Sequence, residues 1–251
     1  MSEQELLERI AALEEENEEL RQSVQHMKSF VREGMGPYVA LEVLDQILEQ
    51  KESTVIAGER REVTMLFSDI RLSTQLSELM DPSDYIRMLN NYFADMIEII
   101  DSWEGNITGF AGDAIIAVFG APRPNEQAAF QAIGSAVAMQ RRMKAVNEWN
   151  HAQGYPNIQM GIGIHTGEAI LGCVGSQTRM KYDMIGRNVN LAARIEGFAA
   201  GGQILVSDET LEAAGTRVVE RPEGAKWVSP KGIREQVFVH DIVGFGSFRL
   251  D

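Results

Sequence analysis

The sequence has a single cysteine, Cys173, among its 251 residues. One thiol excludes an intrachain disulfide and is typical of a protein kept in a reducing compartment. No apolar run approaches the roughly 20 residues that a membrane-spanning helix needs, and the N-terminus is acidic where a signal peptide would be basic. We therefore expect a soluble, cytoplasmic chain without direct membrane insertion.

Basic residues are also scarce, since 23 lysines and arginines stand against 37 aspartates and glutamates, for a formal net charge of -14. Such a surface repels a phosphate backbone, and no strongly basic cluster offsets it, so nucleic acid is not an expected partner. The hydrophobic content of 44% is ordinary for a globular protein. The length allows one domain of usual size plus an appendage.

The first thirty residues carry a heptad repeat. Its a positions are β-branched except for one asparagine, and its d positions are mostly leucine, a pattern that favours two parallel strands in a fixed register. The a positions are Ile10, Asn17, Val24 and Val31, and the d positions are Leu6, Leu13, Leu20 and Met27. We therefore expect a parallel dimeric coiled coil over residues 1–33. The alternative is a single amphipathic helix, whose apolar stripe would normally be wider.

Residues 34–61 are expected to connect this coil to a larger domain. Gly34, Gly36 and Pro37 interrupt the heptads. A second short amphipathic helix is predicted over residues 39–48, and the polar stretch 53–61 reads as a linker. A transducer helix and linker of this kind could pass on a signal from an upstream sensor domain, and a plain spacer is the alternative.

The remaining residues, 62–251, mix apolar patterns typical of strands with patterns typical of helices. Strands are predicted at residues 63–69, 106–109, 114–119, 204–206, near 218 and 237–243, and as a hairpin of 158–165 with 169–174 around Thr166-Gly167-Glu168. Helices are predicted at residues 73–79, 82–100, 125–150, 188–198 and from Asp208. Hairpins without strict strand–helix alternation predict an α+β fold, with a ferredoxin-like antiparallel sheet and packed helices.

Two aspartates flank short apolar runs. Asp69 ends the run Val-Thr-Met-Leu-Phe-Ser, and Asp113 precedes Ala-Ile-Ile-Ala-Val-Phe. Taken singly, Asp69 is explained by a helix cap and Asp113 by a turn. Together, in strands nearly free of charge, buried carboxylates are costly without a partner. Mg²⁺ and Mn²⁺ take oxygen ligands, and a pair of such ions stabilises the attacking and leaving oxygens of phosphoryl chemistry. A nucleotide enzyme is the leading interpretation.

A helix predicted at residues 188–198 carries a second polar group. Asn190 and Arg194 are four residues apart and therefore point to one side of that helix. A long cation on an otherwise apolar side requires an anionic partner, and arginine can stabilise charge that builds on a phosphorus centre. A surface ion pair of Arg194 with Glu196 is the alternative that the spacing leaves open.

Four segments resemble class III nucleotide cyclase catalytic domains. They are residues 58–71 (GERREVTMLFSDIR), 112–120 (GDAIIAVFG), 163–167 (GIHTG) and 182–194 (YDMIGRNVNLAAR). They occur in the family's order, and the resemblance runs from about residue 58 to about residue 243. The coil and short helix before them resemble the dimerising transducer that precedes many such domains.

This resemblance implies a homodimer with two composite sites for a nucleoside triphosphate. Asp69 and Asp113 of one chain, with the backbone carbonyl of Ile70, would hold two Mg²⁺ or Mn²⁺ ions per site. Asn190 of the partner subunit would orient the ribose, and Arg194 of the partner subunit would stabilise the transition state. The 3′-hydroxyl would then attack the α-phosphorus and expel pyrophosphate.

Three further positions follow from the same resemblance. Lys231 matches a position that touches the terminal phosphates, and a solvated surface lysine is the alternative. Leu72 stands where many relatives have glycine, in a loop whose amides cradle phosphates. His165 is better interpreted as a core or turn histidine than as a metal ligand.

The resemblance assigns selection of the purine base to Gly109 and Asp183. Adenylyl cyclases usually have lysine and either aspartate or threonine at these positions, whereas guanylyl cyclases have glutamate and a small residue. Asp183 can accept from the adenine amino group, and facing guanine O6 it would cost roughly 1–3 kcal/mol. Gly109 contributes neither donor nor acceptor. We expect an adenylyl cyclase with a weak preference for ATP; a guanylyl or dual-substrate cyclase making cyclic GMP, or a catalytically weak dimeric signalling module, are the alternatives.

Overall fold

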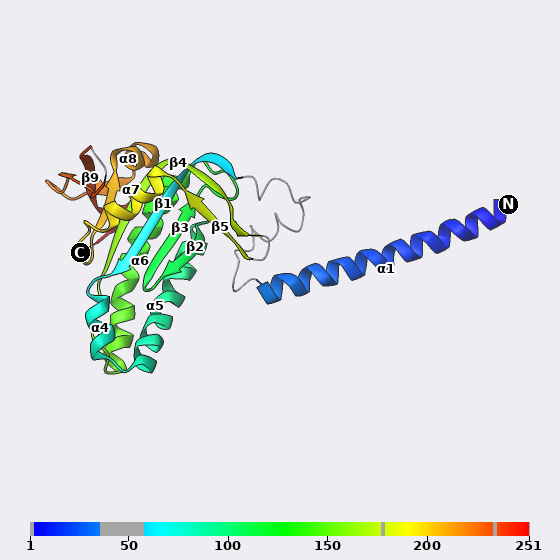
Figure 1. Ribbon diagram of the computed structural model, residues 1–251, viewed down its shortest axis with the longest axis horizontal. Helices are drawn as coiled ribbons and strands as arrows, with labels where there is room; N and C mark the ends of the chain where they lie inside the picture. The colour runs from blue at the N-terminus through cyan, green and yellow to red at the C-terminus, as the bar shows by residue number, and fades with distance from the viewer. Residues whose placement is uncertain (1–2, 36–57, 177–178, 233–234, 251) are drawn as a thin grey trace. The chain divides into compact units, whose positions relative to one another are not determined.

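The computed structural model describes residues 3–35, 58–176, 179–232 and 235–250 (Figure 1). The chain divides into two units, residues 1–55 and residues 56–251. The elements are α1 (Glu3–Met35), β1 (Glu59–Ile70), α4 (Ser73–Leu79), α5 (Pro82–Ser102), β2 (Asn106–Ala111), β3 (Ala114–Phe119), α6 (Ala128–Ala152), β4 (Met160–Ser176), β5 (Arg179–Ile185), α7 (Arg187–Glu196), β6 (Ile204–Ser207), α8 (Asp208–Ala214), β7 (Val218–Glu220), β8 (Lys226–Val228), β9 (Val237–Phe245) and β10 (Phe248–Arg249).

In the first unit, the described residues form the long helix α1, which spans the predicted heptads. Its apolar heptad side chains are exposed by 43% to 64%: these are Leu6, Ile10, Leu13, Leu20, Val24 and Met27. Such a stripe is what a partner helix would cover, and the coiled coil stays a prediction. The helix predicted at residues 39–48 lies outside the described residues, as does most of the predicted linker. None of the helices in the described ranges is long and apolar enough to cross a membrane.

The second unit is built on a sheet in the order β10-β9-β6-β4-β1-β3-β2, with β5 paired to β4 and with β7 and β8 paired to β9. The succession β1-α5-β2-β3-α6-β4, with β4 beside β1 and β3 beside β2, is the ferredoxin-like arrangement that the sequence predicts. β1 begins at Glu59 rather than at Val63, so it includes the last residues of the predicted linker.

The sheet is mixed, and the prediction of a purely antiparallel sheet is wrong at one pair. β6 runs parallel to β4, with Ile162 opposite Ile204 and Ile164 opposite Val206. A parallel pair needs a long crossover, and here β5 and α7 supply it. The apolar pattern of a short strand does not show which other strand it pairs with, so it cannot predict that this pair is parallel.

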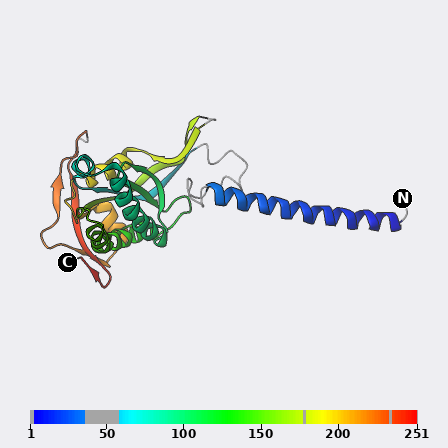
Figure 2. The same ribbon diagram turned by 90° about the horizontal axis from the view of Figure 1, so that it is seen from below.

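Side chains alternate between the two faces of the sheet, as strand geometry requires. In β1, Leu66 and Ile70 belong to a core that contains the buried faces of α5 and α6. Val63 and Met65 belong instead to a core on the other face, which includes Ala192 of α7. Figures 1 and 2 show α5 and α6 lying side by side. The sheet thus separates the helical layer that contains α5 and α6 from the helix that carries Asn190 and Arg194.

The start of α5 confirms a prediction from the sequence. Asp81 is the N-cap and accepts a hydrogen bond from the backbone nitrogen of Ser83 at 2.8 Å, while Pro82 is the first helical residue. Both features satisfy or remove donors that the first turn leaves unpaired.

The hairpin predicted around Thr166-Gly167-Glu168 is wrong. β4 continues through these residues and pairs with β1 along its length, with Thr64 opposite Thr166 and Val63 opposite Gly167. The true hairpin joins β4 to β5. Gly167 is glycine because a Cβ atom there would lie 2.6 Å from the side-chain nitrogen of Asn188, on α7. Close approach of a helix, not a turn, therefore accounts for this glycine.

His240 of β9 ties two other elements to the sheet. Its Nε2 lies 2.6 Å from Oδ1 of Asp208, the first residue of α8, and its Nδ1 lies 2.6 Å from Oε2 of Glu220 in β7. Burial lowers the pKa of His240, but the hydrogen bonds and charges of Asp208 and Glu220 together outweigh it, so the pKa is raised above its usual value. The protonated ring is therefore stabilised in the folded chain.

We expect His240→Gln to destabilise the fold more in mild acid than in alkali. Because the folded-state pKa lies above the ordinary value of 6.5, the contribution of the ring is fully present below that pH and is lost as pH rises through the folded-state value. Urea unfolding of the parent and the variant at about pH 6 and about pH 9 measures this difference.

Glu220→Gln is the matched variant, since it keeps an acceptor but removes one of the two negative charges beside the ring, and it should reduce the same pH-dependent part. A difference between parent and His240→Gln that stays constant or grows towards alkaline pH would contradict the ion pairing described here.

Candidate active site

The structure brings Asp69 and Asp113 together at one edge of the sheet. Asp69 is next to last in β1, and Asp113 lies in the turn between β2 and β3. β1 and β3 are antiparallel neighbours, with Ser68 opposite Ile115, so the end of one lies beside the start of the other. Oδ2 of Asp113 accepts a hydrogen bond from the backbone nitrogen of Ile70 at 3.0 Å.

The two carboxyl groups contact each other. Burial, a hydrogen bond with Asp113 and the charge of Asp113 raise the pKa of Asp69 to about 6, against smaller opposing contributions from Arg71 and the Ile70 amide. A hydrogen bond between two carboxyl groups requires a proton on one of them. In the absence of a cation, that proton relieves the repulsion between the two charges.

This pair fits a divalent cation. A metal ion can replace the shared proton, because it neutralises both carboxylates and accepts oxygen donors. Among the described residues no cluster of three or more His, Cys, Asp or Glu side chains could hold a metal ion. The protein ligands would then be the two carboxylates and a backbone oxygen. Ile70 suits that last role. Its side chain is buried in the core, and its backbone lies next to the carboxylate pair, since its nitrogen donates to Asp113.

The loop after Asp69 is fixed by Arg71. Its guanidinium donates to the carbonyl oxygen of Asp69, at 3.2 Å from Nη2, and forms an ion pair with Glu196 at the end of α7. Leu72 follows with a φ of 61°, in the left-handed region, and its side chain is 68% exposed. A left-handed backbone explains the glycine of many relatives at this position, and leucine there costs about 1 kcal/mol.

α7 presents Asn190 and Arg194 as predicted from their spacing. Asn190 is exposed and Arg194 is half-buried. Neither side chain forms a hydrogen bond or ion pair with another residue of the described ranges. The alternative of an Arg194–Glu196 pair is not observed, because Glu196 pairs with Arg71. The guanidinium of Arg194 is therefore available to an external anion.

The loop that carries Lys231 lies close to Arg194. A Cβ atom on Gly232 would lie 3.6 Å from Nη2 of Arg194, and Gly232 has a φ of 79°. Lys231 is exposed beside it. Arg194 and Lys231 thus belong to segments that meet at one end of α7. No hydrogen bond or ion pair in the described part of the chain connects them with Asp69 or Asp113.

The positions assigned to base selection, Gly109 in β2 and Asp183 in β5, are bridged by Lys181. Nζ of Lys181 lies 3.1 Å from Oδ2 of Asp183, and a Cβ atom on Gly109 would lie 2.8 Å from the same nitrogen. The Lys181 and Asp183 side chains remain 54% and 35% exposed. A cation from β5 therefore occupies the space directly above Gly109.

Reasoning from the sequence missed Arg71 and Lys181. Lys181 is two residues before Asp183 in a strand and so points to the same side, a signal that the sequence contains. Arg71 directly follows the Asp69-Ile70 pair, but its partner Glu196 is distant in the chain, and nothing local predicts that contact.

Comparison with known proteins identifies the family. Residues 55–240 match the model of the adenylate and guanylate cyclase catalytic domain. Adenylate cyclase 1 of Rhizobium meliloti is 32% identical over 209 residues, which are 82% of this chain and 31% of that protein. The chain spans about a third of the length of the first curated relatives it matches.

Two solved structures are similar throughout the second unit. The guanylyl cyclase Cya2 is 41% identical with a TM-score of 0.75, over 77% of this chain and 99% of that one. The adenylyl cyclase CyaB from P. aeruginosa is 34% identical with a TM-score of 0.71, over 74% of this chain and 96% of that one. With the carboxylate pair, the available arginine and the matched family model, the chain belongs to the adenylate and guanylate cyclase catalytic-domain family.

Proposed function

We propose that this chain converts ATP to 3′,5′-cyclic AMP and pyrophosphate, as a homodimer with two composite sites. The observation that carries the proposal is the juxtaposition of Asp69 and Asp113 at adjoining strand ends, where a divalent cation would neutralise both carboxylates. Chains similar to this one include both adenylyl and guanylyl cyclases, so the choice of ATP rests on the residues that face the base.

In this proposal each half of the site has a separate task. Asp69, Asp113 and the carbonyl of Ile70 hold two Mg²⁺ or Mn²⁺ ions, which supply Lewis acidity towards the 3′-hydroxyl and the phosphates when bound. Asn190 of the partner subunit orients the ribose by hydrogen bonding. Arg194 of the partner subunit stabilises the negative charge that builds on the α-phosphate oxygens.

The bond changes balance within the nucleotide. The 3′-oxygen forms a bond to the α-phosphorus as its proton passes to water, and the bond from that phosphorus to the oxygen that bridges the α- and β-phosphates breaks. Pyrophosphate departs with the electron pair. The exposed Lys231 beside Arg194 is suited to bind its charged oxygens.

Base selection follows from the Lys181–Asp183 pair over Gly109. Adenine presents a donor at its 6-amino group and an acceptor at N1, which match a carboxylate and an ammonium in that order. Guanine presents an acceptor at O6 and a donor at N1, so both contacts conflict in the same orientation. Because the pair is partly exposed, water can relieve some of the conflict, and the preference for ATP is modest.

A guanylyl activity is the second candidate, and one observation favours it. The ammonium over Gly109 belongs to Lys181, whose side chain is 54% exposed. A lysine at position 109 itself would be held more rigidly, whereas Lys181 can turn and donate to guanine O6. The 41% identical structure is that of a guanylyl cyclase.

The first unit has a proposed role as well. We assign residues 1–33 to a parallel dimeric coiled coil, residues 34–61 to a transducer, and residues 62–251 to the catalytic domain. A coil that holds two chains together would raise the effective concentration of one half-site near the other, and an upstream sensor domain could act through it.

Asp69→Asn should abolish the metal-dependent reaction. The variant keeps size and hydrogen bonding but removes the charge that holds the cation, so cyclic nucleotide formation with Mn²⁺ or Mg²⁺ should fall by about 100-fold or more. Chromatographic separation of the products measures it. Asp95→Asn, which breaks an ion pair between α5 and Arg142 of α6, is the matched control and should retain turnover. An active Asp69→Asn chain would refute the metal assignment.

Mixing two inactive variants tests the composite site. Asp69→Asn lacks the metal half and Arg194→Ala lacks the donor half, so each homodimer should be inactive. After unfolding and refolding together, the mixed dimer has one complete site, and about a quarter of the wild-type rate should return if subunits pair at random. If the mixture remains as inactive as its parents while dimers form, both halves belong to the same chain.

Lys181→Ala should reduce the ratio of kcat/KM for ATP over GTP. Loss of one donor to adenine N1, and of one conflict with guanine, corresponds to a change of about tenfold. Gly109→Lys in the Lys181→Ala background should restore the ratio, because the new ammonium then enters an empty space. A ratio unchanged by Lys181→Ala would exclude this lysine from the base pocket.

A further inference from the structure

The face of β4 on which α7 packs consists mostly of glycine. Residues 161, 163, 165 and 167 alternate along the strand and point to the same side, and three of them are glycine. A Cβ atom on Gly163 would lie 2.1 Å from the backbone nitrogen of Glu196, in the last turn of α7. A Cβ atom on Gly167 would lie 2.6 Å from the side chain of Asn188, in its first turn. Both ends of the helix therefore rest on glycines of this strand.

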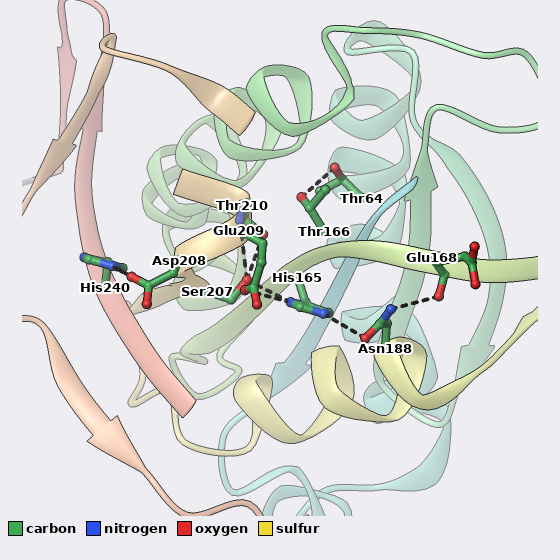
Figure 3. A network of polar contacts seen from close by, with 10 residues as sticks. All are labelled: Thr64, His165, Thr166, Glu168, Asn188, Ser207, Asp208, Glu209, Thr210 and His240. Atoms are coloured by element: carbon green, nitrogen blue, oxygen red, sulfur yellow. Dashed lines mark hydrogen bonds and ion pairs between the residues drawn. The ribbon is translucent and has the colours of Figure 1, made fainter. Parts of the chain in front are cut away.

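His165 stands between these two glycines and is the polar group of that face. Its side chain is 3% exposed. Nδ1 lies 2.8 Å from the hydroxyl of Ser207, at the end of β6, and Nε2 lies 3.3 Å from Oδ1 of Asn188 on α7 (Figure 3). The imidazole thus connects three elements: β4, β6 and the helix that bears Asn190 and Arg194.

The neighbouring hydrogen bonds determine which ring nitrogen of His165 donates and which one accepts. Nδ2 of Asn188 donates to the carbonyl oxygen of Glu168 at 2.9 Å, so Oδ1 of Asn188 is the acceptor that faces the ring. Nε2 of His165 therefore carries the hydrogen, and Nδ1 accepts from the hydroxyl of Ser207. Burial lowers the pKa of His165, although Asn188 and Glu209 act in the opposite direction. A neutral ring is what this chain of hydrogen bonds requires.

The buried side of the first turn of α7 is held by this anchor, while Arg187 in the same turn makes only an exposed ion pair with Glu235. The N-cap of α7 is Gly186, which makes no side-chain hydrogen bond. Asn188 is held from two directions, by Glu168 and by His165, and Asn190 follows two residues later. At the other end Glu196 pairs with Arg71. The placement of Asn190 and Arg194 is therefore set by contacts that neither residue makes itself.

We propose that His165 is a positioning residue of the cyclase reaction, which acts through Asn188 to hold the first turn of α7 where Asn190 and Arg194 serve the nucleotide. The proposal rests on the proposed function, because it takes those two residues to be the donors of the site. His165 itself touches no substrate. Its contribution is to geometry, and a displacement of about 1 Å at a reacting group can lower turnover on the order of 100-fold.

Two substitutions test the roles of the two ring nitrogens of His165 separately. Glutamine places its amide nitrogen where Nε2 of histidine lies, so His165→Gln keeps a donor to Asn188. Asparagine places its amide at Nδ1, so His165→Asn keeps a contact with Ser207 and loses Asn188. Both variants are neutral, polar and smaller than the ring. The cavity of about 410 Å³ beside His165, lined also by Glu62, Glu209 and Glu212, admits water to the vacated space.

We expect His165→Gln to keep kcat within about threefold of the parent and His165→Asn to lower it about 10- to 100-fold. The KM for ATP should change by less than about threefold in both. Hydrogen exchange of the α7 amides should accelerate in His165→Asn only. In an Asn188→Ala background, His165→Asn should cause no further loss, since it acts through that side chain.

Thr166→Val is the matched structural control. It removes the buried hydrogen bond of 2.9 Å between the Thr64 and Thr166 hydroxyls on the opposite side of β4, and it should lower Tm without lowering kcat. Equal kcat in His165→Gln and His165→Asn would overturn the proposal. A kcat that follows Tm across all three variants would overturn it too, because a merely structural histidine behaves in that way.

Arg194→Ala distinguishes failure of this inference from failure of the proposed function. If Arg194→Ala is inactive while His165→Asn turns over like the parent, the positioning role alone is wrong. If Arg194→Ala is as active as the parent, the catalytic assignment is wrong, and the positioning role falls with it.

Discussion

The mutual repulsion of Asp69 and Asp113 is the constraint on which the site depends. Two carboxyl groups at adjoining strand ends, in partial burial, share a hydrogen bond and raise the pKa of Asp69 to about 6. Such a pair destabilises the folded chain unless something positive lies between the charges. The sheet fixes them there nonetheless, because β1 and β3 are hydrogen-bonded neighbours whose ends cannot separate. The pairing of β1 with β3 thus holds Asp69 and Asp113 close together, as the proposed cation site requires.

A second constraint is the short distance between α7 and strand β4. α7 can approach the sheet closely only where the strand lacks side chains, at Gly163 and Gly167. Close packing leaves no slack for the helix to slide, since protein interiors have few voids. The single large residue of this face, His165, then fills the remaining space with directional hydrogen bonds rather than with apolar bulk. Specific orientation of α7 follows from that choice.

Much of this could be predicted from the sequence because it is local. Strand periodicity placed β1 and β3, the Asp81-Pro82 pair placed the start of α5, and the i,i+4 spacing placed Asn190 and Arg194 on one side of a helix. The juxtaposition of Asp69 with Asp113 was anticipated from the lack of other charges in their strands. The structure brings those two side chains together, while their roles as metal ligands stay a proposal.

What could not be predicted depends on contacts between distant segments. A turn is the wrong prediction for Gly167, because the sequence does not distinguish a glycine that lets a helix approach from one that permits a turn. The parallel pairing of β6 with β4 was missed for a related reason, since register across a crossover leaves no local pattern. The contact of Lys181 with Gly109 also joins strands that are far apart in the sequence, so it could not be predicted, although the shared side of Lys181 and Asp183 could.

The Arg71–Glu196 ion pair connects these constraints within one chain. Arg71 holds the carbonyl of Asp69 and, through Glu196, the end of α7. In the proposed homodimer the carboxylates of a chain serve one site, whereas its α7 serves the other. A displacement of the metal loop in one site would therefore pull on the helix that supplies the second. In that proposal, the Arg71–Glu196 ion pair of each subunit would connect the two composite sites.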